Sequence, residues 1–141
     1  MSPVNSNHIL IIDDSVAEIE LLKKIMCENH PNLKIDSAMD GEKTVEVLNE
    51  YTEFSKPEII LLEIEIPIKD GLEVLEYIKQ SELLCSIPVI VLSSTQSEDK
   101  ITRAYELKAC CFIHKPDNVD EYSEILKTIE EFWLDIVQLP Y

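Results

Sequence analysis

The sequence has no long apolar run. None of its hydrophobic stretches approaches the roughly 20 residues that a helix needs to cross a bilayer. The first eight residues, MSPVNSNH, also lack the basic region and the apolar region of a secretory signal peptide. These two absences argue against a membrane-spanning or secreted protein, and they predict a cytoplasmic one.

Basic residues are scarce. The chain has 12 lysines and arginines against 28 aspartates and glutamates, so its formal net charge is −16. Proteins that bind phosphate backbones or anionic lipid need a basic face, and no cluster of basic residues is visible here. We therefore expect no direct binding to nucleic acid or to a membrane, and we interpret most of the acids as a solvated, self-repelling surface.

The cysteines lack metal-binding spacing. Cys27, Cys85, Cys110 and Cys111 contain no pair spaced as in a zinc knuckle. Cys110 and Cys111 are adjacent, so alternation along a strand sends them to opposite faces. The pattern favours small buried hydrophobic residues over metal ligands.

The size of the chain fits a single domain. Its 141 residues are 45% apolar and 28% charged, which is ordinary for one globular domain with one core. We predict one domain over residues 1–141, with a core from about 8 to 135 and a short C-terminal tail.

Short apolar runs alternate with helical patterns along the chain. Helices are predicted from Ser15 to just before Pro31, and over 40–51, 71–81, 97–108 and 119–134, because apolar residues recur there at helical spacing. Strands are predicted at 8–13, 33–38, 57–63, 87–94 and 110–115. The first, third and fourth are apolar throughout, which is typical of parallel strands covered by helices on both faces.

Five β/α repeats predict an α/β fold. With right-handed crossovers they form a doubly wound five-stranded parallel sheet with helices on both faces, as in flavodoxin-like folds. The second strand alternates and so belongs at an edge, which the order 2-1-3-4-5 satisfies. Ligands in such folds bind beyond the carboxyl ends of the strands, at the switch point between strands 1 and 3.

Polar residues stand at four of those strand ends. They are Asp13 and Asp14 after the first strand, Glu63 after the third, Ser93 and Ser94 at the fourth, and Lys115 before Pro116 at the fifth. Three close carboxylates repel one another unless a cation neutralises them, and hard oxygen ligands suit Mg²⁺. A hydroxyl and an ammonium beside the metal form a cradle for phosphoryl oxygens. Each piece alone has an ordinary explanation as a cap or turn, but their joint placement predicts one site.

The motifs IIDDS, LLEIEIPIKDG, VIVLSS and FIHKP resemble the CheY-like receiver domain of two-component response regulators, over essentially the whole chain. The resemblance implies a non-enzymatic signalling protein that docks onto partners and takes a phosphoryl group from a sensor histidine kinase. It also implies that Mg²⁺ is held by Asp13, Asp14, the residue at the position of Glu63, and the backbone carbonyl of Glu65.

The same resemblance implies roles for the remaining strand-end residues. Ser93 is the switch hydroxyl, and with Lys115 it grips the phosphoryl oxygens. Phe112 is the aromatic residue that reports activation. The bond between Lys115 and Pro116 is often cis in such proteins.

A narrower resemblance lies near the C-terminus. AYELKACCFIHKP and TIEEFWLDIVQLP are similar to the small receiver-only regulators that partner bacterial phytochromes. This implies a homodimer through the face of helix 4, strand 5 and helix 5, with Tyr105, Phe132 and Trp133 on it. An apolar stripe that continues to the end of the last helix agrees with self-association. The alternative is that Trp133 folds back onto its own core.

Glu63 departs from the family pattern, in which its position is the phosphoacceptor aspartate. The extra methylene displaces the carboxylate, and an error near 1 Å in a phosphoryl-transfer site costs about 100-fold. We therefore expect no efficient phosphorylation. Glu63 either mimics the activated state, belongs to a phosphorylation-independent adaptor, or was introduced to lock a normal regulator. Glu65 is expected to add further negative charge to the site.

Two other function classes compete with the receiver. A Mg²⁺-dependent phosphohydrolase on a similar sheet needs a nucleophilic aspartate with a second acid two residues later. Glu63 and Glu65 have that spacing, but the first of them is a glutamate and not the required aspartate. The sequence also lacks a cap insertion that could enclose a substrate. A vestigial dimerisation or adaptor module would need no working site. The receiver is the main interpretation, and measured Mg²⁺ affinity discriminates it from the vestigial module, which should bind metal no better than a generic acidic surface.

Overall fold

The computed structural model describes residues 7–140, and its centre is one parallel sheet. The strands stand in the order β2-β1-β3-β4-β5, and every neighbouring pair is parallel. This confirms the predicted fold class and strand order. The strands are β1 (His8–Ile12), β2 (Lys34–Ala38), β3 (Ile59–Leu62), β4 (Val89–Ser93) and β5 (Cys111–His114).

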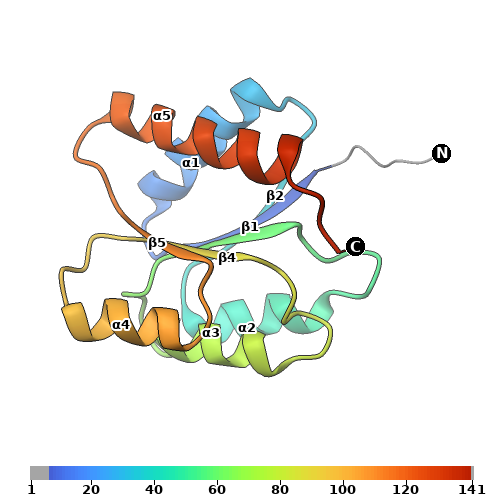
Figure 1. Ribbon diagram of the computed structural model, residues 1–141, viewed down its shortest axis with the longest axis vertical. Coiled ribbons are helices and arrows are strands. Elements are labelled where there is room, and N and C mark those ends of the chain that lie inside the picture. Colours follow the sequence, from blue (N-terminus) through green and yellow to red (C-terminus); the bar gives the residue numbers. More distant parts are fainter. Residues whose placement is uncertain (1–6, 141) are drawn as a thin grey trace.

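Helices cover both faces of the sheet. As Figure 1 shows, α1 and α5 lie on one face, and α2, α3 and α4 lie on the other. The helices are α1 (Val16–Asn29), α2 (Gly41–Glu50), α3 (Gly71–Gln80), α4 (Glu98–Glu106) and α5 (Val119–Glu130). Right-handed crossovers that alternate direction from β1 produce this doubly wound arrangement.

Two hydrophobic cores lie on opposite faces of the sheet. Along each central strand successive side chains point to opposite faces, so Leu10 and Ile12 pack under α2 to α4, whereas Ile9 and Ile11 pack under α1 and α5. Because both faces are covered, β1, β3 and β4 are buried at every position. The edge strands β2 and β5 are only partly buried, which confirms the placement of the alternating second strand at an edge.

Each of the five α-helices begins at a polar N-cap. The cap side chain accepts a hydrogen bond from the backbone N–H three residues on, which satisfies one of the free donors of the first turn. The caps are Ser15, Asp40, Asp70, Ser97 and Asn118. The Ser15–Glu18 capping box is only half formed, because the Glu18 carboxylate accepts a hydrogen bond from the Tyr122 hydroxyl at 2.6 Å instead.

The last helix differs from the prediction. The expected helix over 119–134 is α5 followed by a six-residue π-helix, η2 (Glu131–Ile136). The backbone N–H of Val137 bonds to the carbonyl of Phe132, five residues earlier, at 2.8 Å. The wider turn keeps Trp133 packed against the core on the α1 and α5 face.

Two smaller expectations are contradicted by the structure. The cysteines are not buried: Cys85 and Cys110 are exposed, because they lie in the loop between α3 and β4 and just before the edge strand β5. Cys27 and Cys111 are half-buried, and Cys111 packs against the core under α1 and α5. Residues 7–140 contain no cis peptide bond, so the bond between Lys115 and Pro116 is trans. Within the same range, no helix has the length and apolar character to cross a membrane.

A buried acid ties α1 to α5. Glu130 is fully buried, and its carboxylate accepts hydrogen bonds from His30 Nδ1 at 2.8 Å and from the Asn29 amide at 3.3 Å. His30 Nε2 lies 3.0 Å from Asp135 of η2. Burial lowers the pKa of His30, but the hydrogen bonds to Asp135 and Glu130 outweigh burial and raise the pKa above its ordinary value.

This cluster predicts a pH dependence of stability. A raised folded pKa means that the folded state binds the proton more tightly, so the His30 contribution is complete below the unfolded pKa of about 6.5 and is lost as pH rises through the folded pKa. We expect His30→Gln to lower the free energy of unfolding by about 1–2 kcal/mol at pH 6 and by less at pH 9. Urea unfolding at both pH values measures this, with exposed His114→Gln as the control; a deficit that does not change with pH contradicts it.

Candidate functional site

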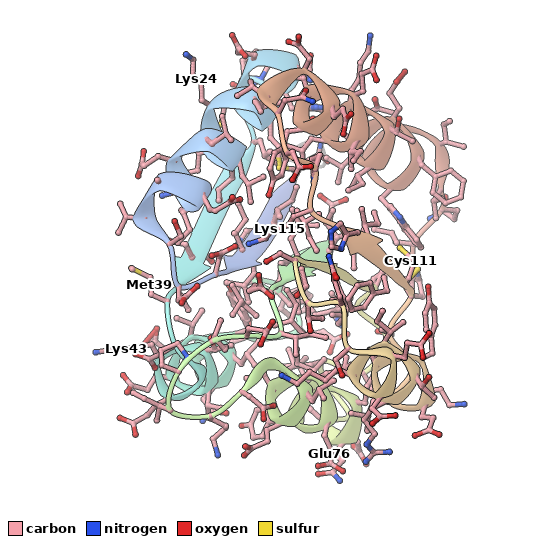
Figure 2. All side chains as sticks on the ribbon, turned by 90° about the vertical axis from the view of Figure 1, so that its left-hand side faces the viewer. Lys24, Met39, Lys43, Glu76, Cys111 and Lys115 are labelled. Atoms are coloured by element: carbon pink, nitrogen blue, oxygen red, sulfur yellow. The ribbon has the colours of Figure 1, made fainter. Side chains whose placement is uncertain are left out.

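The strand ends are aligned by backbone hydrogen bonds that continue one step beyond the strands. Asp13 N–H donates to the Ala38 carbonyl at 3.1 Å, Glu63 N–H donates to the Ile12 carbonyl at 2.9 Å, and Lys115 N–H donates to the Ser93 carbonyl at 2.9 Å. The polar residues that follow β1, β3 and β5 therefore start from one edge of the sheet. Figure 2 views the molecule toward this edge, with Lys115 near the middle.

Lys115 bridges two buried carboxylates. Its Nζ atom lies 2.9 Å from Asp13 Oδ2 and 2.9 Å from Glu63 Oε1. The side chains of Lys115, Asp13 and Glu63 are only 12%, 4% and 5% exposed, so none of the three groups is well solvated. The single positive charge of the ammonium therefore offsets one of the two carboxylate charges and is shared between both acids.

The ionisation of these groups reflects their burial and pairing. Burial raises the pKa of Asp13, although the hydrogen bonds from Lys115 and from the Ser15 backbone act in the opposite direction. Burial lowers the pKa of Lys115, but hydrogen bonds to Asp13 and Glu63 outweigh it and raise that pKa above its ordinary value. Lys115 therefore stays charged at neutral pH.

The other oxygen of Glu63 is held by two further donors. The Ser93 hydroxyl donates to Oε2, and the backbone N–H of Glu65 donates to the same oxygen at 3.0 Å. Ser93 is fully buried, and its Oγ atom accepts from Thr95 N–H at 3.2 Å, which fixes the hydroxyl. The Glu63 carboxylate is thus held by an ammonium, a hydroxyl and an amide.

The oxygen atoms near Asp13 have the chemistry that a hard divalent cation requires. Asp13 Oδ1 accepts from Ser15 N–H at 3.0 Å, and the neighbouring Asp14 carboxylate is exposed. Within residues 7–140, the carbonyl of Glu65 accepts no backbone hydrogen bond. The receiver resemblance assigns these two carboxylates and this carbonyl to a divalent cation, and oxygen groups of this kind suit Mg²⁺ or a similar ion.

The predicted cluster of three carboxylates is not assembled in this conformation. No group of three or more His, Cys, Asp or Glu side chains within residues 7–140 is arranged to hold a metal ion. The reason is that Glu63 faces Lys115 and Ser93, whereas Asp14 faces solvent. A metal role for Glu63 stays a prediction. Ser94, the second serine of this strand end, is exposed.

Glu65 does not crowd the site as expected. Its side chain is exposed and lies 3.2 Å from the Lys100 ammonium in the first turn of α4. The pair connects the segment after β3 to α4. Sequence reasoning missed Lys100 and Thr95; the only signal for Lys100 was a lysine in the first turn of a helix, where acids are commoner.

The predicted switch and dimer residues lie near β5. Phe112 is half-buried against the core under α2 to α4, and its N–H donates to the Tyr105 hydroxyl at 3.0 Å. Tyr105 and Phe132 are each 49% exposed. Trp133 packs on the core under α1 and α5, with its ring edge-on to Phe132 at 5.3 Å. Trp133 is half-buried and does pack onto its own core, and its place on a dimer face stays a prediction.

Removing the bridging ammonium tests this arrangement. We expect Lys115→Met to lower the free energy of unfolding by about 3–5 kcal/mol at neutral pH, because it leaves two buried carboxylates without a cation. Lys43 on α2 is exposed and points away from the site (Figure 2), so Lys43→Met is a matched loss of charge with little expected effect. Urea unfolding measures both variants, and equal losses would contradict the role assigned to the bridge.

Known proteins are similar to this chain in sequence and fold. The chain is 35% identical over 135 residues to the response regulator Rcp1 of Synechocystis sp., covering 94% of this chain and 92% of that protein. The crystal structure of the phosphorylated cyanobacterial phytochrome response regulator RcpA matches with a TM-score of 0.89 and 36% identity, over 96% of this chain and 99% of that one. The Mn²⁺-bound form of Rcp1 matches with a TM-score of 0.86 and 33% identity, over the same shares.

The family assignment covers every residue of the site. The model of the response regulator receiver domain matches residues 9–137, a range that begins in β1 and ends just after η2. This family match does not favour the phosphohydrolase alternative. The chain therefore belongs to the response regulator receiver domain family.

Proposed function

We propose that this chain is a single-domain response regulator that acts by docking, with Glu63 as a built-in carboxylate at the phosphoacceptor position. The observation that carries the proposal is the set of three donors on Glu63: Lys115 Nζ, the Ser93 hydroxyl and the Glu65 N–H. The family resemblance implies that this hydroxyl and this lysine bind phosphoryl oxygens. Here they hold the glutamate instead.

The donors make Glu63 a poor nucleophile. Attack on a phosphoryl donor needs a carboxylate oxygen with a free lone pair in line with the leaving group. Oε2 of Glu63 accepts two hydrogen bonds and Oε1 accepts one from Lys115, so at most one lone pair stays free, and the side chain is only 5% exposed. The added methylene also displaces the acid from the position of an aspartate, so positioning is lost as well.

Glu63 imitates a phosphoryl group only in part. It supplies one negative charge and two oxygens, whereas a phosphorylated side chain supplies about −1.5 to −2 and three oxygens. Shifting the ratio of active to inactive conformations by 100-fold takes about 2.7 kcal/mol of differential interaction. That is comparable to one charge-assisted hydrogen bond, so partial activation without phosphate is expected.

We assign a divalent cation, Mg²⁺ in the cell, to Asp13, Asp14 and the carbonyl of Glu65. The oxygen donor set supports this, as does the similarity to a receiver that was crystallised with Mn²⁺. When bound, the cation neutralises the acids and any phosphoryl oxygens beside them. Asp13 is already fixed by Ser15 and Lys115, so the metal would bind to a partly ordered ligand.

The partners follow from the same similarities. A sensor histidine kinase, including the phytochrome type, is the upstream candidate, and a signalling protein is the downstream one. A homodimer through α4, β5 and α5 is supported by the exposed rings of Tyr105 and Phe132. The net charge of −16 argues against nucleic acid and anionic membranes as partners.

Restoring an aspartate tests the proposal. We expect Glu63→Asp to gain a labile phosphoryl mass with acetyl phosphate and Mg²⁺, at least about 100-fold faster than the present chain. Intact-mass spectrometry over time measures this. Glu65→Asp, which shortens an exposed acid two residues on by the same methylene, is the matched control and should stay unlabelled. Labelling of the parent chain at the rate of Glu63→Asp refutes the proposal.

Metal affinity separates a working receiver from a vestigial adaptor module. Mg²⁺ that binds only the folded state raises the melting temperature, so calorimetric titration and thermal unfolding should agree. We expect Asp14→Asn to weaken Mg²⁺ binding at least about tenfold. Glu28→Gln, which neutralises an exposed acid in the last turn of α1, should leave it unchanged. If both variants bind Mg²⁺ as the parent does, the adaptor is favoured.

A further inference from the structure

The outer margin of β2 is open. In the sheet formed by residues 7–140, β2 has β1 as its only neighbour. The N–H of Lys34 donates to the Asn7 carbonyl at 2.9 Å, so the backbone groups of Lys34 face β1. Because these groups alternate in direction along a strand, the N–H and carbonyl groups of Ile35 and Ser37 point away from the sheet. This margin can therefore pair with a further strand.

A groove lies between this margin and the end of α2. Its volume is about 500 Å³, and its walls include Lys34 and Asp36 of β2 together with Glu50 and Tyr51. Oδ2 of Asp36 accepts a hydrogen bond from the Tyr51 hydroxyl at 2.7 Å and lies 2.7 Å from His8 Nε2. Burial raises the pKa of Asp36, but these two hydrogen bonds outweigh burial and lower the pKa below its ordinary value. The groove therefore presents a carboxylate that is fixed in place and ionised at neutral pH.

The side chains of β2 alternate between the two faces of the sheet. Ile35 packs against the core under α1 and α5. Lys34 and Asp36 therefore lie on the α2 face beside the groove, and Lys34 is exposed. A lysine and an aspartate that flank one residue are complementary to a reversed copy of themselves, because antiparallel pairing about that residue places each lysine opposite an aspartate.

We propose that β2 pairs antiparallel with β2 of a second copy of this chain, about a two-fold axis at Ile35. In this register Ile35 exchanges both of its outward hydrogen bonds with Ile35 of the second copy, a pair that an antiparallel ladder contains and a two-fold axis permits. Lys34 and Asp36 of opposite copies then face each other at the positions without hydrogen bonds, where side chains are closest. The symmetry forms this ion pair twice, once on each side of the axis.

Local charge selects a second copy as the occupant. Charged residues at a sheet edge discourage strands that bring the same charge, whereas β2 of a second copy brings the opposite charge to each position. The neighbouring register with outward hydrogen bonds is centred on Ser37, and it places Asp36 opposite Ala38 instead of Lys34. The net charge of −16 opposes contact between copies equally in both registers, and salt screens this repulsion beyond about 8 Å at physiological ionic strength. The two ion pairs therefore determine the register.

This contact goes beyond the proposed function and does not depend on it. β2 and β5 lie at opposite margins of the sheet, as Figure 2 also shows, so the β2 contact leaves the face of α4, β5 and α5 free. Labelling of Glu63→Asp with acetyl phosphate does not require the β2 margin either. Failure of one proposal is therefore distinguishable from failure of the other.

Sedimentation equilibrium over a range of protein concentrations measures the contact. We expect Lys34→Glu to weaken self-association at least about tenfold, because two opposite-charge pairs become two like-charge pairs. Ser37→Pro removes an outward N–H and leaves the hydrogen bonds to β1 in place, so a loss of at least about tenfold is expected there too. Lys24→Glu makes the same change in net charge at an exposed residue of α1 that points away from the sheet (Figure 2), and it should stay within about threefold of the parent. Thermal unfolding of each variant shows whether it is folded.

A disulfide cross-link tests the register directly. Ile35→Cys places two thiols across the two-fold axis with Cα atoms about 5.5 Å apart, a separation that a disulfide spans. With glutathione disulfide as the oxidant, we expect a covalent dimer whose cross-linked peptide contains position 35 of both copies, as identified by mass spectrometry. The parent chain, treated in the same way, shows what the four native cysteines contribute.

Three results would each overturn the proposal. The first is a parent whose association is no stronger than that of Lys34→Glu and Ser37→Pro, which would leave the margin to an extended segment of another protein. The second is an equal loss of association in Lys24→Glu. The third is an Ile35→Cys variant that forms no cross-link through position 35.

Discussion

The site depends on one buried ammonium. Lys115 reaches from the end of β5 to acids at the ends of β1 and β3, although β3 and β4 separate β5 from β1 in the sheet. Buried charges of one sign cost several kcal/mol each unless a partner neutralises them. The single cation therefore makes the acidic strand ends compatible with a folded protein, and it determines which way Glu63 turns.

The orientation of the Glu63 side chain connects the site to the rest of the molecule. Glu63 binds the Ser93 hydroxyl on β4 and the backbone of Glu65, and Glu65 pairs with Lys100 at the start of α4. The exposed rings near β5 continue from there, since Tyr105 of α4 accepts from the backbone of Phe112. A change at the strand ends thus has a continuous set of contacts through which to reach the face proposed for self-association.

Much of this arrangement follows from local sequence. The uninterrupted apolar runs of β1, β3 and β4 predict strands covered on both faces, and the alternating residues 33–38 predict an edge. The order of the sheet then follows from the handedness of the crossovers. Because parallel strands end at one edge, the placement of Asp13, Glu63, Ser93 and Lys115 beside one another was also predictable.

Contacts between distant segments were not predictable. Three features depend on which side chains meet across the fold: the exposure of Asp14, the pairing of Glu65 with Lys100, and the π-helix after α5. Sequence periodicity does not contain this information. The positive φ of Ile68 (71°), in the loop between β3 and α3, is of the same kind, because backbone hydrogen bonds join this loop to Gly41 and Gly71 at the starts of α2 and α3. Local periodicity and chirality are enough to specify the elements, their order and the residues at the strand ends. Which donors hold Glu63, and which apolar side chains remain in solvent, depend on packing between segments far apart in the chain, so these features follow from the folded structure and not from local patterns.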